Sequence, residues 1–144
     1  MMILLIAAAV TLVAPPAPVV EALHKRFPGA TIEKWSKENE HGVVLYDVEF
    51  IQDGHKLEAD VRQDGTIDNW EREIPESELP QAARAGALAA HPGARILEVM
   101  ACTRVTGGED ELEGYEIVLQ PPKGRKAEVT VTSDGKILED GDDD

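Results

Sequence analysis

Two short stretches of the chain alternate between apolar and polar residues, the pattern of a β-strand that buries one face. They cover residues 45–50 and 56–62. The apolar positions are Tyr46, Val48, Phe50, Leu57, Ala59 and Val61. The polar positions between them are Asp47, Glu49, Glu58, Asp60 and Arg62. This pattern predicts two antiparallel strands with one face against a core and a charged face left open.

Turns and outer strands complete this unit. Asp-Gly pairs at 53–54 and 64–65 stand where the chain must reverse, and glycine supplies the positive φ that tight hairpin turns need. Residues 31–35 and 66–70 supply two outer strands. The sequence therefore predicts a four-stranded antiparallel meander.

A helix is expected before these strands. Val19, Val20, Leu23 and Phe27 recur at helical spacing, and the Pro-Gly pair at 28–29 ends the periodic segment. Proline prevents further helical turns and glycine lets the chain reverse. We expect this helix to lie over the apolar face of the meander.

The chain repeats this order. Pro-Gly-Ala at 28–30 returns 64 residues later, "YDVEF" is matched by "YEIVL", and "KLEADVRQDGTI" is matched by "KAEVTVTSDGKI". The predicted fold class is α+β, with two tandem repeats at 18–74 and 75–139. Each repeat is expected to be one α-helix followed by a four-stranded antiparallel β-meander, with the helix packed on one sheet face. Units of about 60 residues are marginal alone, so the two should share one surface and unfold together.

Two acidic segments of the second repeat lie outside the matched blocks. Residues 107–114, "GGEDELEG", are predicted to form a mobile hairpin loop and are a candidate for partner contact. Residues 140–144 are predicted to form a solvated acidic tail. A calcium loop is not expected there, because such a loop needs a later bidentate acid.

The first 17 residues bear on the cellular compartment. Residues 3–14 form an uncharged apolar run that is short for a bilayer span and right for the hydrophobic part of a secretory signal. The predicted location is periplasmic or secreted, without stable membrane insertion unless this segment stays uncleaved. An uncleaved anchor and a misassigned start remain as alternatives, since no Lys or Arg precedes the run and prolines follow Ala14 and Ala17.

Charge and residue spacing argue against several classes of function. The chain has 28 acidic and 14 basic residues, a net charge of −14, and a field of that sign repels nucleic acid and anionic lipid. No metal or catalytic spacing is found around the sole cysteine, Cys102, or the four histidines. We expect no enzyme activity, no cofactor and no metal, although a spatial cluster can be invisible in sequence. The histidines are His24, His41, His55 and His91.

The order of these motifs resembles the PepSY-like family, also called the β-lactamase-inhibitor-like family. The resemblance covers residues 18–139 and rests on "RFPGATI", "YDVEF" and "EADVRQDGTI", then "ELPQAARAGALAAHPGARI", "GYEIVL" and "AEVTVTSDGKIL". It implies an exported, non-catalytic binding or regulatory module with a protein partner, for which a hydrolase is one class. The acidity leaves open a structural or ion-buffering envelope protein without one specific partner. An enzyme not recognised in the sequence comes third.

The open face of the first repeat is the candidate partner surface. Alternation from Ile32, together with a glycine bulge at 63–65, predicts that Trp35 and Trp70 face outward among the charged residues. Aromatic anchors among charges are typical of a protein-binding face. The alternative is that one or both indoles pack against the other repeat or cover a sheet edge. The candidate residues are Trp35, Asp47, Glu49, Glu58, Asp60, Arg62 and Trp70.

Overall fold

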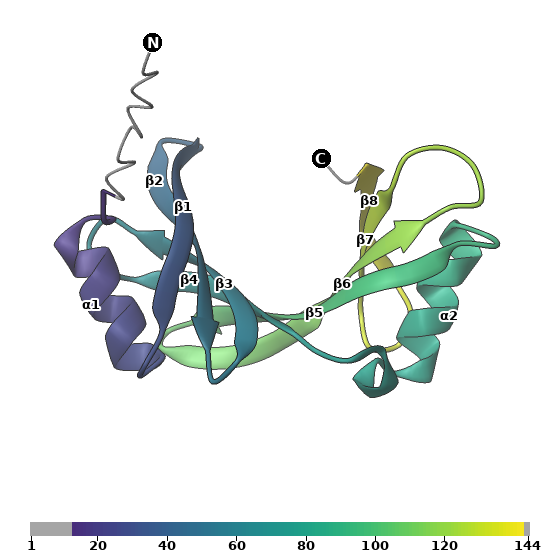
Figure 1. The fold of residues 1–144 in the computed structure, drawn as a ribbon, viewed down its shortest axis with the longest axis horizontal. Coiled ribbons are helices and arrows are strands. Elements are labelled where there is room, and N and C mark those ends of the chain that lie inside the picture. The colour runs from purple at the N-terminus through teal and green to yellow at the C-terminus, as the bar shows by residue number, and fades with distance from the viewer. Residues whose placement is uncertain (1–12, 143–144) are drawn as a thin grey trace, which may run out of the picture.

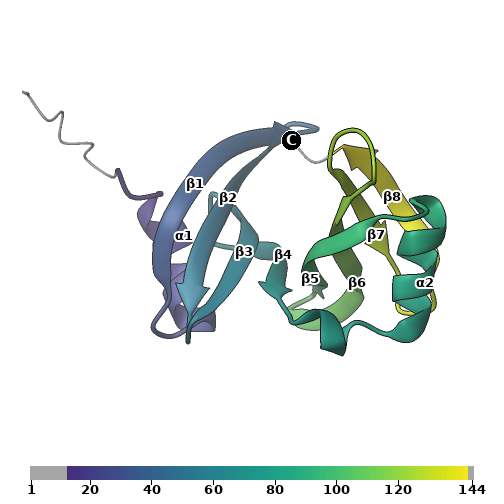
Figure 2. The same ribbon diagram turned by 45° about the vertical axis from the view of Figure 1, so that its right-hand side comes forward.

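Eight strands form one continuous antiparallel sheet in the order β1 to β8 (Figures 1 and 2). The structure is a computed structural model that describes residues 13–142, so most of the predicted signal segment and the last two residues lie outside the described residues. The helices are α1 (Ala17–Arg26), the short 3₁₀ helix η1 (Glu76–Glu78) and α2 (Gln81–Ala90). The strands are β1 (Thr31–Glu40), β2 (Val43–Gln52), β3 (His55–Arg62), β4 (Ile67–Glu73), β5 (Arg95–Thr106), β6 (Glu109–Gln120), β7 (Ala127–Val131) and β8 (Ile137–Asp142).

The predicted fold class of two tandem helix-plus-meander repeats is wrong. Strands make up 54% of the described residues, and β4 pairs directly with β5, from Asn69 opposite Arg104 to Glu73 opposite Met100. We call this pairing the seam. Two separate four-stranded sheets would each leave these strands with unpaired backbone groups at an edge, and the seam satisfies those groups.

Both helices lie on the same side of the curved sheet, near its two ends (Figures 1 and 2). Val19 and Leu23 of α1 are fully buried against β1–β4, while Ala83 and Ala87 of α2 are fully buried against β5–β8. Each helix is followed by a Pro-Gly pair with a positive φ at the glycine, the exit expected from the sequence. The sheet therefore has a helix-covered face and an opposite face, which we call the inner face.

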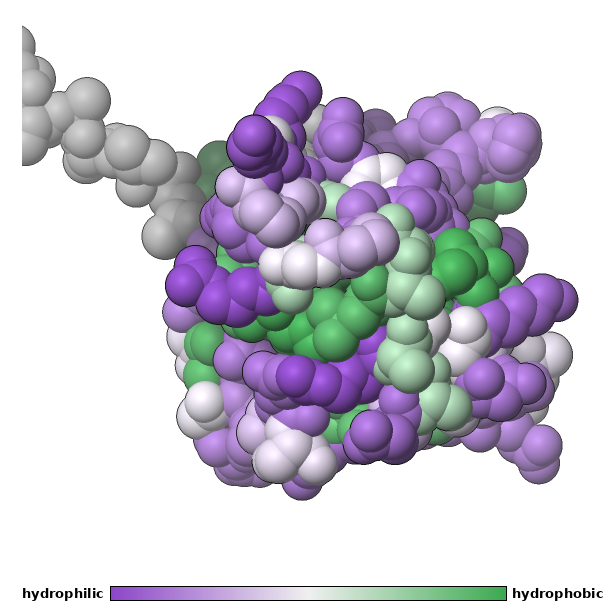
Figure 3. Space-filling view, turned by 90° about the vertical axis from the view of Figure 1, so that its right-hand side faces the viewer, coloured by the Kyte–Doolittle hydropathy of each residue, from purple (hydrophilic) through white to green (hydrophobic). Residues whose placement is uncertain are grey.

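The helix α2 is slim because most of its residues are alanine. Gly86 lies so close to the turn between β7 and β8 that a Cβ atom there would stand 2.4 Å from the carbonyl oxygen of Gly135. The outward side of α2 is also apolar, and Figure 3 shows apolar atoms gathered on this end of the molecule. The exposed alanines of α2 are Ala82, Ala85, Ala89 and Ala90.

The two acidic segments differ from their predicted states. Gly107 and Gly108 form a tight turn, but residues 109–114 belong to β6 and lengthen the β5–β6 hairpin, so the predicted mobile loop is wrong. Residues 140–142 are exposed, as expected of a tail, yet they belong to β8 and pair with β7. Within residues 13–142, none of the helices has the length and apolar character needed to cross a membrane.

Candidate binding surface

Half-buried acidic side chains follow one another across the inner face. Glu58 on β3 lies opposite Glu49 on β2 and opposite Glu71 on β4. The row crosses the seam, where Glu71 lies opposite Cys102 on β5, and reaches Glu116 on β6. The acids on this face are Asp47, Glu49, Glu58, Asp60, Glu71, Glu98, Glu116 and Glu128.

The five charged residues predicted for the open face do lie on the inner face. In the ladder between β2 and β3, Asp47 is opposite Asp60 and Glu49 is opposite Glu58. Arg62 is exposed, and its Nε donates a hydrogen bond to Asp68 at 2.8 Å. Their role as a partner surface stays a prediction.

Trp35 faces the helix side, so its predicted outward orientation is wrong. The register shifts between Ile32 and Lys34, which leaves one extra residue on β1 and reverses the alternation beyond it. Trp35 therefore lies opposite the buried Val48, with its ring 5.9 Å from that of Tyr46. This half-buried indole packs against the core of the first half.

Trp70 also faces the helix side instead of the inner face. Val61 pairs with Ile67, as the predicted glycine bulge requires, but a further register shift between Asp60 and Val61 turns the rest of β4 over. Trp70 consequently lies opposite Ala59 and packs against the core of the first half. The alternative placed one or both indoles against the other repeat or over a sheet edge; in the structure both pack against the core of their own half, and Trp70 in addition donates a hydrogen bond to Asp110 of the second half.

One close pair of carboxyl groups lies within the first half, between Glu58 and Asp47. Burial, followed by the influence of the Asp47 carboxyl group, raises the pKa of Glu58 to about 9. Burial likewise raises the pKa of Asp60, against a hydrogen bond from Asn69 that lowers it. With a pKa this high, the Glu58 carboxyl group is protonated at neutral pH.

A second carboxyl pair lies at the seam, between Glu71 and Glu116. Burial, then repulsion from Glu71 and Glu128, raises the pKa of Glu116 to about 8, and burial raises the pKa of Glu71 to about 6. The Cys102 thiol beside them is buried, and burial raises its pKa, so the thiol stays protonated. A protonated thiol is a poor nucleophile, which fits a binding surface better than a cysteine catalyst.

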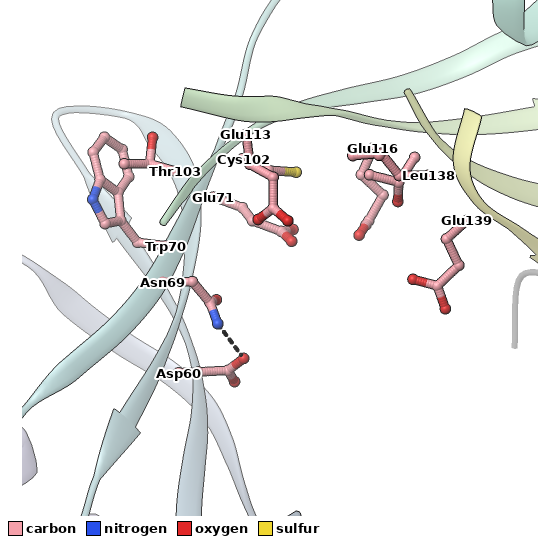
Figure 4. Close-up of a pocket in the computed structure, with 11 residues that line it drawn as sticks. Asp60, Asn69, Trp70, Glu71, Cys102, Thr103, Glu113, Glu116, Leu138 and Glu139 are labelled. Atoms are coloured by element: carbon pink, nitrogen blue, oxygen red, sulfur yellow. Dashed lines mark hydrogen bonds between the residues drawn. The ribbon is translucent and has the colours of Figure 1, made fainter. Parts of the chain in front are cut away.

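A cavity of about 320 Å³ opens on the inner face at the second pair. Figure 4 shows the carboxyl group of Glu71 beside Cys102, and the hydrogen bond of 3.0 Å that Asn69 donates to Asp60. Glu116 and Glu139 line the side formed by the second half. The cavity is polar and joins residues from both halves.

Two groups on this face bring possible metal ligands together. The ligand atoms of Glu71, Cys102 and Glu116 all lie within 4.8 Å of one another. The same holds for Glu38, Asp47 and Asp60. Each group offers three such residues, well below the roughly six to eight oxygens that calcium takes.

The sequence matches no known family description and no curated protein. Solved structures do share the fold. A BLIP-like protein of Bacteroides fragilis has a TM-score of 0.62 and 21% identity, over 92% of this chain and 89% of that one. A DUF2874 family protein of Bacteroides uniformis has a TM-score of 0.66 and 16% identity, over 90% of each chain. A protein of Bacteroides eggerthii described as periplasmic has a TM-score of 0.68 and 19% identity, over 90% of each chain.

These structural similarities establish the fold. They can also be compared with the family and the location that were predicted from the sequence. They support a BLIP-like fold, although membership in the PepSY-like family is not shown. The description of the Bacteroides eggerthii protein agrees with the predicted periplasmic or secreted location. At 21% identity the likeness to the BLIP-like protein shows a shared fold.

The second half of the surface was missed in the sequence. Glu116 and Glu128 alternate with apolar neighbours just as Asp47 and Glu49 do, whereas Glu71 stands between Trp70 and Arg72. That alternation indicated that these acids share one face of a sheet. Because two separate sheets were expected, the sequence did not predict that they lie beside the acids of β2 and β3. Only the seam makes the two sets one surface.

Proposed function

We propose that this protein is an exported, non-catalytic binding module that docks a cationic segment of another protein on the inner face of its sheet. The observation that carries the proposal is the face itself, which is continuous across eight strands, opposite both helices, and lined by half-buried acids. Complementary charge steers such a partner and selects against anionic ones.

The lysines and arginines near the two carboxyl pairs, among the described residues, form ion pairs with other acids. They do not neutralise the two carboxyl pairs. The ion pairs are Lys34–Glu49 at 4.0 Å, Lys56–Glu98 at 3.1 Å, Arg62–Asp68 at 2.8 Å and Arg104–Glu113 at 2.6 Å. An incoming Lys or Arg would therefore meet uncompensated carboxyl groups at the centre of the face.

The BLIP-like fold supports a protein as the partner, and a hydrolase is the partner class implied by the family resemblance. The competing function is a structural or ion-buffering envelope protein that uses its acidity without one specific partner. The two functions differ in salt dependence, since loose electrostatic association is lost when salt screens the charges.

Capture from an extract of the source organism's envelope, at moderate salt, tests the proposal. Glu49→Lys reverses a charge on the inner face, and Glu21→Lys makes the same change on the exposed side of α1. We expect the protein and Glu21→Lys to retain one defined partner and Glu49→Lys to lose it. Equal capture by both variants would place the partner surface elsewhere, and loss of all capture with salt would favour the ion-buffering function.

A further inference from the structure

A second pocket, of about 510 Å³, opens on the helix side of the sheet, between the second half of α1 and the tip of the β5–β6 hairpin. Figure 1 shows this hairpin tip beside the end of α1, where Arg26 bonds Asp110. The pocket therefore lies on the side of the sheet opposite the inner face, and it is formed by residues from both halves. Its volume is in the range of about 300–1,000 Å³ that small-molecule sites have.

The wall of this pocket is mainly apolar. Ala22 of α1, Ile67 of β4 and Val105 of β5 line it and are half-buried. Gly107 and Gly108 form the hairpin turn at its edge, and a Cβ atom on either glycine would meet nothing within 4 Å. An aliphatic chain that enters this open space would be removed from water against the apolar wall, which favours its binding.

The charged groups at the pocket are unequally engaged. Arg26 and Asp110 bond each other, and the guanidinium carbon of Arg26 lies 5.1 Å from the ring centroid of Phe27 and 5.3 Å from that of Trp70. Lys25 lines the same pocket and forms no ion pair within residues 13–142. The charge that remains for a ligand is therefore positive.

Backbone donors lie beside this charge. The N–H groups of Gly107 and Gly108 have no hydrogen-bond acceptor in the part of the chain that the structure describes. A carboxylate has only acceptors, and its two oxygens can take hydrogen bonds from an ammonium group and from backbone N–H groups. A ligand that suits this pocket therefore has an apolar body and one carboxylate.

We propose that this pocket binds a small monocarboxylic acid, whose aliphatic chain packs on Ala22, Ile67 and Val105 and whose carboxylate is held at Lys25. The site goes beyond the proposed function, because ligand and protein partner would use opposite sides of the sheet. The net charge of −14 repels anions at long range, so a preference for an anion has to come from contacts within the pocket.

Three ligands of equal chain length and different charge test this preference: octanoate, octan-1-ol and octylammonium. Amide NMR signals of Gly65, Gly107 and Gly108, which all line the pocket, report on binding at this place. We expect octanoate to bind at least about fivefold more tightly than either of the others. Gly54 and Gly124, which do not line the pocket, should keep their signals.

Two variants with matched controls test the residues. Lys25→Glu replaces an attraction by a repulsion and should weaken octanoate binding by about tenfold, whereas Lys123→Glu in the loop between β6 and β7 should leave it unchanged. Val105→Phe fills the pocket and should abolish binding, whereas Val43→Phe at the exposed start of β2 should not. Circular dichroism confirms that each variant is folded.

The possible results separate clearly. Absence of octanoate shifts at the three pocket glycines would overturn the inference. Octylammonium binding as tightly as octanoate would overturn the carboxylate as the recognised group, and unchanged octanoate binding in Lys25→Glu would do the same. Because Lys25 is exposed, its variant remains a test even if Val105→Phe fails to fold. None of these results affects capture of a protein partner on the inner face, so the proposed function is tested independently.

Discussion

Trp70 is held by three contacts on the helix side of the sheet. Its ring meets Phe27 edge-on with 5.5 Å between ring centroids, and the guanidinium carbon of Arg26 lies 5.3 Å from its centroid. Its indole N–H donates a hydrogen bond to Asp110 at 3.3 Å. These contacts join α1, β4 and the β5–β6 hairpin.

Trp70→Ala should therefore cost about 2–3 kcal/mol of unfolding free energy, somewhat less than for a fully buried aromatic. Trp70→Phe keeps the ring contact and loses the hydrogen bond, so a loss of about 1 kcal/mol is expected. Urea denaturation followed by circular dichroism measures both. If Trp70→Ala keeps the stability of the unmodified protein but loses partner binding, Trp70 acts in partner binding and not in core packing.

Glu58 should make stability depend on pH in the direction opposite to that of a salt-bridged acid. Its pKa is about 9 in the folded protein against an ordinary value of 4.5, so its contribution to stability is fully present below about 4.5 and is lost as pH rises toward 9. Glu58→Gln should flatten this decline. After allowance for solvent screening at a partly exposed site, we expect a relative gain of about 1–2 kcal/mol at alkaline pH.

Urea midpoints measured from mildly acidic to alkaline pH check this expectation. Glu21→Gln on α1 removes the same charge far from the inner face and serves as the control. If the urea midpoint falls with pH at the same slope in the unmodified protein and in Glu58→Gln, the assignment of the proton to Glu58 is contradicted.

Single extra residues explain why the orientation of side chains was harder to predict than the strands. Alternation correctly separated Tyr46 and Val48 from Asp47 and Glu49. The shifts beside Ile32 and Asp60 each reverse every later position on the strand, and no local signal marked them. Such irregularities depend on packing against α1 and on neighbouring strands.

At the scale of elements, α2 depends on a close approach to the β7–β8 turn. An added Cβ at Gly86 would meet the carbonyl oxygen of Gly135 at 2.4 Å, and this oxygen belongs to backbone that cannot easily move. Gly86→Ala should cost about 2 kcal/mol or more through overpacking, even though alanine favours helices by about 1 kcal/mol.

Thermal or urea unfolding of Gly86→Ala measures this cost. Gly141→Ala is the control, because a Cβ there meets nothing within 4 Å. A Gly86→Ala variant as stable as the unmodified protein would show that α2 can move away from the turn. The small residues of α2 permit close packing, but no pattern in the sequence identifies the β7–β8 turn as the element that packs against them.

At the scale of the whole molecule, the two halves should unfold in one transition. The seam joins them by backbone pairing, and Lys56 on β3 bonds Glu98 on β5 at 3.1 Å across it. Calorimetry and circular dichroism should report the same single midpoint. Separate transitions, or a stable isolated fragment 75–139, would contradict this.

The element order was predictable from the sequence, whereas the single sheet was not. Helix exits, alternating strands and Asp-Gly turns are local patterns, and they placed both helices and most strands. Pairing of β4 with β5 joins strands separated by a helix and a 3₁₀ turn, and no local pattern specifies it. The inner face as one surface is a consequence of that pairing.

Asp110 near the end of the β5–β6 hairpin accepts hydrogen bonds from Arg26 of α1 and from Trp70 of β4. The hairpin of the second half is therefore fastened to the helix of the first, on the side of the sheet away from the inner face. A brace of this kind restricts changes in the curvature of the sheet. A partner that docks on the inner face, as proposed, would then lose little conformational entropy, and a modest number of contacts would suffice for binding.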